Sequence, residues 1–67
     1  MKSKFTPREH QIIALIAKAT LRKNIASQLE ISIHTVDTHI QSIHKKTNTT
    51  TIAELLLFVR ADKVYLV

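Results

Sequence analysis

The chain has 67 residues, the size of one small domain, and contains no cysteine, so disulfides and cysteine-ligated zinc are excluded. Ten Lys and Arg residues oppose five Asp and Glu residues, and the formal net charge of +5 favours nucleic acid or another acidic surface as partner. A basic surface without a dedicated polyanion is the alternative. No apolar run approaches the ~20 residues that cross a bilayer, and no signal peptide is recognisable, so we expect a cytoplasmic protein without membrane contact.

A helical pattern runs through the whole chain. There is no glycine and only one proline, which argues against tight β-turns and glycine-rich phosphate loops. Apolar residues recur at the spacing of amphipathic helices. The sequence therefore predicts a single all-α domain, residues 1–67, with four helices over about residues 7–19, 21–29, 33–47 and 51–60.

Capping residues mark the ends of these helices. Thr6 and Glu9 form a capping box around Pro7, which suits the first helical position, and Phe5 is placed to pack back on the first turn. The other predicted boundaries are Thr20 and Ser32 as N-caps of the second and third helices, Asn48 as a left-handed end of the third, and Thr51 with Glu54 as a second capping box.

Two short helices joined by a tight turn, the second amphipathic, describe a helix-turn-helix. Four segments resemble the LuxR-type helix-turn-helix domain, the DNA-binding output module of many bacterial response regulators and quorum sensors. They are "FTPREHQIIALIA" (5–17), "KNIASQLEIS" (23–32), "HTVDTHIQSIHKK" (34–46) and "AELL" (53–56). The match covers nearly the whole chain in order.

The resemblance implies a four-helix bundle that binds double-stranded DNA as a bacterial, nucleoid-associated transcription regulator. The third helix, 33–47, would lie in the major groove as the recognition helix. The family usually attaches this domain to an N-terminal regulatory domain, so a stand-alone regulator and a piece of a larger protein are both open. The resemblance assigns phosphate contacts to Lys23, Thr35, Lys45 and Lys46, and base contacts to Asp37, Thr38 and Gln41.

Asp37 is the unusual member of this set. The family often has Lys or Arg at the positions of Asp37 and Gln41, where a cation can pair with guanine. Asp can instead accept from cytosine N4 and Gln can pair with adenine, so different bases would be read. Fewer cations also lower the attraction to phosphate, and Arg22 could restore part of it. The alternative is a protein-interaction or dimerisation module that keeps the fold and has lost specific DNA binding.

Other departures from the family affect the backbone and the core. Ala19, Glu30 and Asn48 stand where the family usually has glycine. Asn tolerates the left-handed conformation, whereas Glu30 is expected to carry modest strain. His44 and Thr47 replace large apolar residues, which predicts a looser core.

The last helix is apolar around its whole circumference at "LLLFV", residues 55–59. One side must contact the first helix, and the rest needs another cover. The last helix is often the dimer contact in LuxR-type domains, so we expect a homodimer through Leu55, Leu57 and Phe58. The alternative cover is the chain's own tail, at Val64, Tyr65 and Leu66.

Neither a metal site nor catalysis is predicted. His34, His39 and His44 are spaced by five residues, which is off the four-residue spacing of helical metal ligands. No nucleophile with a base partner and no paired carboxylates are recognisable. We therefore expect no enzyme activity and no cofactor. Protonation of His34 or His39 would add positive charge, so DNA binding is expected to tighten at low pH.

Overall fold

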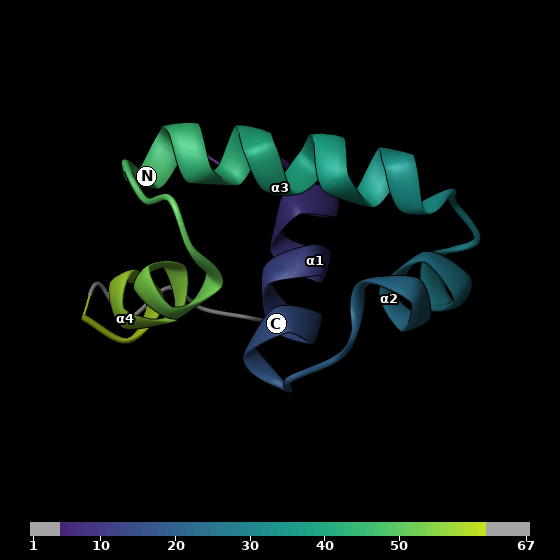
Figure 1. The fold of residues 1–67 in the computed structure, drawn as a ribbon, viewed down its shortest axis with the longest axis horizontal. Coiled ribbons are helices and arrows are strands. Elements are labelled where there is room, and N and C mark those ends of the chain that lie inside the picture. The colour runs from purple at the N-terminus through teal and green to yellow at the C-terminus, as the bar shows by residue number, and fades with distance from the viewer. Residues whose placement is uncertain (1–4, 62–67) are drawn as a thin grey trace.

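The computed structural model describes residues 5–61, with side chains described as far as Val59. These residues form four helices, α1 (Pro7–Ala17), α2 (Arg22–Leu29), α3 (Ile33–Thr47) and α4 (Ile52–Ala61). The longest helix is α3, and the other three lie on one side of it, with α1 between α2 and α4 (Figure 1). The prediction of an all-α, four-helix fold is confirmed.

A single core joins the four helices. Every helix contributes aliphatic side chains that lie out of contact with water, and each such burial contributes about 1.5–3 kcal/mol relative to exposure. The fully buried side chains are Ile12 and Ile13 of α1, Ile25 of α2, Val36 and Ile43 of α3 and Leu55 of α4.

No helix within residues 5–61 is both long enough and apolar enough to cross a membrane.

Three of the four predicted N-caps are confirmed. At the start of α1 the Glu9 N–H donates to Thr6 Oγ1 at 3.1 Å, and the Thr6 N–H donates to Glu9 Oε1 at 2.9 Å. Phe5 packs edge-on against the ring of His10, with 5.6 Å between ring centroids, which fixes the direction from which the chain enters α1. The N–H of Thr35 bonds Ser32 Oγ at 3.0 Å to begin α3, and that of Glu54 bonds Thr51 Oγ1 at 3.1 Å to begin α4.

The prediction of Thr20 as N-cap of α2 is wrong, because Thr20 is used to end α1. Ala19 adopts the left-handed conformation, with φ of 61°. The following N–H, of Thr20, then donates back to the carbonyl of Leu15 at 3.0 Å, which closes α1 with a Schellman motif. The second helix therefore begins one residue later than predicted, with Leu21 as an N-cap that makes no side-chain bond.

The other two helix ends follow the same rule. Glu30 and Asn48 have φ of 56° and 55°, and the prediction of a left-handed Asn48 is confirmed. A left-handed residue that carries a Cβ costs about 1 kcal/mol, less for Asn than for Ala or Glu. The tight turn between α2 and α3 is thus strained at Glu30, and that turn fixes the angle between the two helices.

Candidate nucleic-acid interface

One face of α3 points away from the other helices. Its side chains are spaced by four, three and four residues, so they line up along the helix. We call this set the outer face of α3. All four of its residues are exposed, and they are His34, Thr38, Gln41 and Lys45.

The outer face contains two of the three predicted base-contacting residues, Thr38 and Gln41. The hydroxyl of Thr38 donates to the carbonyl of His34 at 3.0 Å. Its proton is therefore used within the helix, and its methyl group and oxygen lone pairs remain for a base edge. His34 was not among the predicted contacts, although the helical spacing alone would have placed it on this face.

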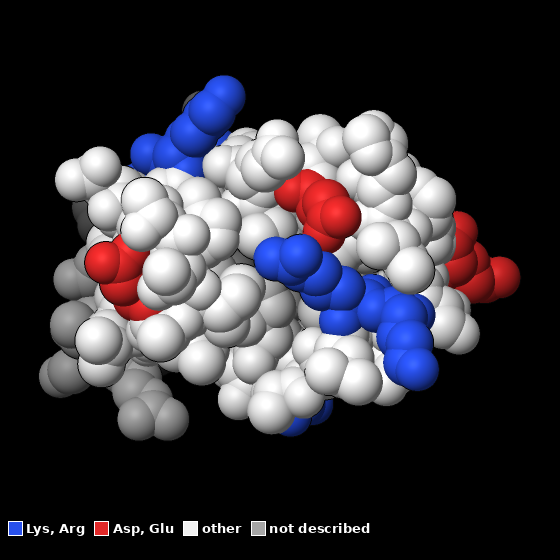
Figure 2. Space-filling view, viewed as in Figure 1, with Lys and Arg blue, Asp and Glu red and all other residues white. Residues whose placement is uncertain are grey.

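Asp37, the third predicted base contact, lies on the flank of α3 that faces α2. Its Oδ1 lies 3.4 Å from Nε of Arg22, and the two side chains are 39% and 55% exposed. That oxygen has no contact with solvent and accepts no hydrogen bond, so the charge of Arg22 is its compensation. Figure 2 shows an acidic side chain against a basic one between the start of α2 and α3. We call Arg22 and Asp37 the exposed pair.

Two of the predicted phosphate contacts lie near the starts of α2 and α3. Lys23 is exposed in the first turn of α2. Since α2 has no side-chain cap, its N-terminal N–H groups and its helix dipole favour an anion there. Thr35 is half-buried, and its Oγ1 lies 2.9 Å from Ser32 Oγ at the start of α3.

The two lysines near the end of α3 have different surroundings. Lys45 is exposed on the outer face, whereas Nζ of Lys46 lies 2.6 Å from Oε1 of Glu9, a residue that is 3% exposed. Ser42 donates to the other carboxylate oxygen of Glu9 at 2.9 Å. We call Glu9 and Lys46 the buried pair. It places Lys46 against α1, and a phosphate contact by this residue stays a prediction.

The ionisation of Glu9 is tied to these contacts. Burial by itself raises the pKa of the Glu9 carboxyl group. The hydrogen bonds from Lys46, from the N–H of Thr6 and from Ser42 act in the opposite direction and outweigh it, so the pKa lies below the ordinary value. Glu9 is therefore a charged group that links α1 to α3.

The two positions for which a looser core was predicted are joined by hydrogen bonds. Thr47 is buried, and its hydroxyl donates to the carbonyl of Ile43 at 2.9 Å. Thr49 Oγ1 lies 2.8 Å from Thr47 Oγ1 and 2.7 Å from Nδ1 of His44. Polar contacts thus connect the end of α3 to the segment that leads into α4.

The three predicted dimer residues of α4 differ in how deeply they are buried. Leu55 is fully buried in the core, because a helix that is apolar on all sides must turn one side inward, so we remove it from the interface. Leu57 is 66% exposed, and Phe58 is half-buried against the core. The alternative cover, Val64 to Leu66, lies outside the described residues.

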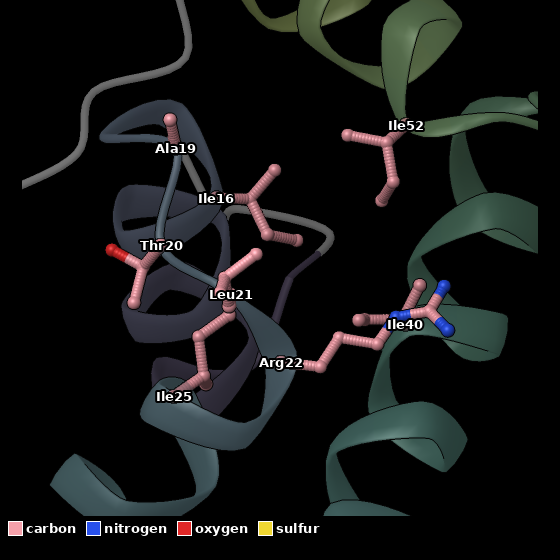
Figure 3. A pocket seen from close by; sticks show the side chains of 8 residues that line it. All are labelled: Ile16, Ala19, Thr20, Leu21, Arg22, Ile25, Ile40 and Ile52. Atoms are coloured by element: carbon pink, nitrogen blue, oxygen red, sulfur yellow. The ribbon is translucent and has the colours of Figure 1, made fainter.

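An apolar hollow of about 520 Å³ lies between the start of α2, the middle of α3 and the start of α4 (Figure 3). Arg22 is the one charged residue in its lining, and its side chain crosses the hollow's edge toward Ile40 of α3. The aliphatic stem of Arg22 borders the hollow, and its charged end reaches Asp37. Among residues 5–61, no three His, Cys, Asp or Glu side chains are grouped to hold a metal ion.

Two helices joined by a strained turn, the second with an exposed polar and basic face, define a helix-turn-helix domain. Residues 3–59 match the family described as bacterial regulatory proteins of the luxR family, named GerE. The chain belongs to this family of DNA-binding transcription regulators, and the predicted resemblance is confirmed.

Curated relatives point in the same direction. The chain is 34% identical over 58 residues to response regulator Rre1 of Synechocystis sp., and 38% identical over 58 residues to the probable transcriptional regulator ycf29 of Cyanophora paradoxa. It is 32% identical over 63 residues to the nitrate/nitrite response regulator protein NarL of Escherichia coli K12. These matches cover 87%, 87% and 94% of this chain and 25%, 28% and 29% of the relatives, so the chain spans about a quarter of their length. No solved structure gives a significant match.

Proposed function

We propose that this domain regulates transcription in the bacterial cytoplasm by binding double-stranded DNA with sequence preference, with α3 in the major groove. The supporting observation is the outer face of α3, which carries base-compatible side chains and lies on the side away from the other three helices. Thr38 and Gln41 would meet base edges. Lys23, Thr35 and Lys45 would meet phosphates, with Lys46 a weaker candidate because it pairs with Glu9.

Selection of duplexes from a random library at low salt tests this proposal, followed by titrations of the enriched and scrambled duplexes at several salt concentrations. We expect an enriched motif and a steep loss of affinity with salt. Lys23→Gln should reduce the salt slope by about one. Lys18→Gln is the matched control, since it removes an equal charge from the end of α1. Equal effects of the two substitutions would point to unspecific attraction.

The proposal includes a homodimer through α4, with Leu57 at its centre, so that two copies read two half-sites. The exposed leucine on α4 supports it, since the described core provides no cover for that side chain. Leu57→Ser should convert the dimer to a monomer in sedimentation equilibrium. Leu21→Ser, which changes a leucine that is 62% exposed at the start of α2, should leave the dimer intact. The relatives named as response regulators also support an N-terminal regulatory domain as part of the whole protein.

A protein-interaction module with the same fold is the second candidate. It is favoured by the two ion pairs, which occupy Arg22 and Lys46 and leave fewer cations for phosphate. Weak binding that is indifferent to DNA sequence would favour this candidate over the first.

A further inference from the structure

We propose that Arg22 determines which residues of α3 read bases, by holding the carboxylate of Asp37 toward α2 and so withdrawing position 37 from base reading. The inference rests on the proposed function, sequence-preferring DNA binding through α3. It assigns specificity to Thr38 and Gln41, with Arg22 as a specificity-determining residue that lies outside the recognition helix.

The Asp37 carboxylate is turned toward Arg22. A carboxylate reads cytosine by accepting a hydrogen bond from N4, for which an oxygen must face the groove. Oδ1 of Asp37 is shielded from solvent and lies 3.4 Å from the guanidinium of Arg22. The pairing takes one of the two carboxylate oxygens and turns the side chain toward the start of α2, off the outer face of α3.

Arg22 is placed to reach Asp37 from the start of α2. Arg22 is the first residue of α2, and its side chain extends across the rim of the apolar hollow to α3 (Figure 3). The stem borders the apolar hollow, and a guanidinium does not lose its charge at any physiological pH. The positive charge that attracts Asp37 is therefore present under the conditions in which the domain would bind DNA.

The pair also reduces the electrostatic repulsion between the Asp37 carboxylate and DNA phosphates. An unpaired carboxylate next to phosphates would repel them, whereas a carboxylate beside a guanidinium forms a neutral group. Lys23, the next residue along α2, has no ion pair within the described part of the chain, so a positive charge remains at the start of α2.

The test is duplex selection with the wild type, Asp37→Asn, Arg22→Gln and the double variant, after circular dichroism has shown that each is folded. We expect the wild type and Asp37→Asn to enrich the same motif, because the paired carboxylate reads no base. Arg22→Gln frees that carboxylate, so it should gain a preference for cytosine of about fivefold or more at one base pair of each half-site. The double variant should lose that new preference.

Lys23→Gln is the matched control, because it removes the same charge from the same turn of α2. It should weaken binding to all duplexes alike and leave the motif unchanged. A preference that disappears in Asp37→Asn alone would overturn the inference, since Asp37 would then read a base directly. An identical motif for the wild type and Arg22→Gln would also overturn it. A wild type that enriches no motif would instead reject the proposed function, and the inference with it.

Discussion

Two acid–base pairs hold opposite flanks of α3, and they differ in burial. The buried pair joins Glu9 to Lys46 at 2.6 Å, and its carboxylate also accepts from Thr6 and Ser42. The exposed pair joins Arg22 to Asp37 at 3.4 Å, with both side chains more than a third exposed. A charge removed from water must keep its partners, whereas a charge that water still reaches can exchange them. The buried pair therefore belongs to the fold, and the exposed pair to the interface.

Removal of the Glu9 side chain should cause the largest loss of stability. Glu9→Ala deletes a capping box and the link between α1 and α3, so the free energy of unfolding should fall by about 3 kcal/mol. For a domain of this size that is a large fraction of the total. Urea unfolding followed by helix circular dichroism measures the change. Glu54→Ala removes the exposed capping box of α4 and should cost much less; equal losses would show that the buried pair adds little.

Acid should weaken the buried pair in a predictable direction. Because the pKa of Glu9 is lower in the folded than in the unfolded protein, the unfolded chain binds more protons, and stability rises with pH in this range. The contribution is fully present above the ordinary value near 4.5 and is lost as the pH falls through the folded pKa. The difference in unfolding free energy between the wild type and Glu9→Gln should therefore shrink from pH 6 to pH 3. A difference that stays constant would contradict this account.

The two neighbouring lysines of α3 should separate stability from binding. Lys46→Gln should lower the free energy of unfolding by about 1–2 kcal/mol, because Glu9 loses a charged partner while it stays buried. Lys45→Gln should change stability by less than about 0.5 kcal/mol and should reduce the salt slope of DNA binding by about one. Parallel denaturation and binding titrations compare them. The reverse assignment of the two effects would place Lys46, rather than Lys45, on the DNA.

The exposed pair should give the smallest effect on stability. Arg22→Gln and Asp37→Asn should each change the free energy of unfolding by less than about 1 kcal/mol, since water screens both groups. Denaturation at low and high salt measures it. A loss as large as that of Glu9→Ala would remove the distinction between the two pairs.

The helix boundaries show which features of the fold local sequence can predict. Thr6, Ser32 and Thr51 each begin a helix as predicted, because a cap depends on residues at most three positions away. The prediction for Thr20 failed because the left-handed Ala19 turns the N–H of Thr20 back to α1. A glycine at position 19 would have signalled that turn locally, whereas with alanine the signal was only that the family usually has glycine there.

The candidate site was predicted less completely than the fold. Helical spacing places Thr38, Gln41 and Lys45 on one exposed face, and these predictions stay open until DNA binding is measured. Pairing depends on residues far apart in sequence: Glu9 and Lys46 are 37 positions apart. The resemblance alone gave Lys45 and Lys46 the same role, because it cannot show that one of them faces α1.

The sequence by itself determined the number of helices and most of their caps, because these depend on local hydrogen bonds and apolar spacing, and its motifs indicated the family. Only the tertiary structure decided that Asp37 faces Arg22, that Lys46 faces Glu9 and that Leu55 lies in the core. The reason is physical. A side chain's charge and shape are written in the sequence, but its partner is fixed by the packing of helices that are distant along the chain.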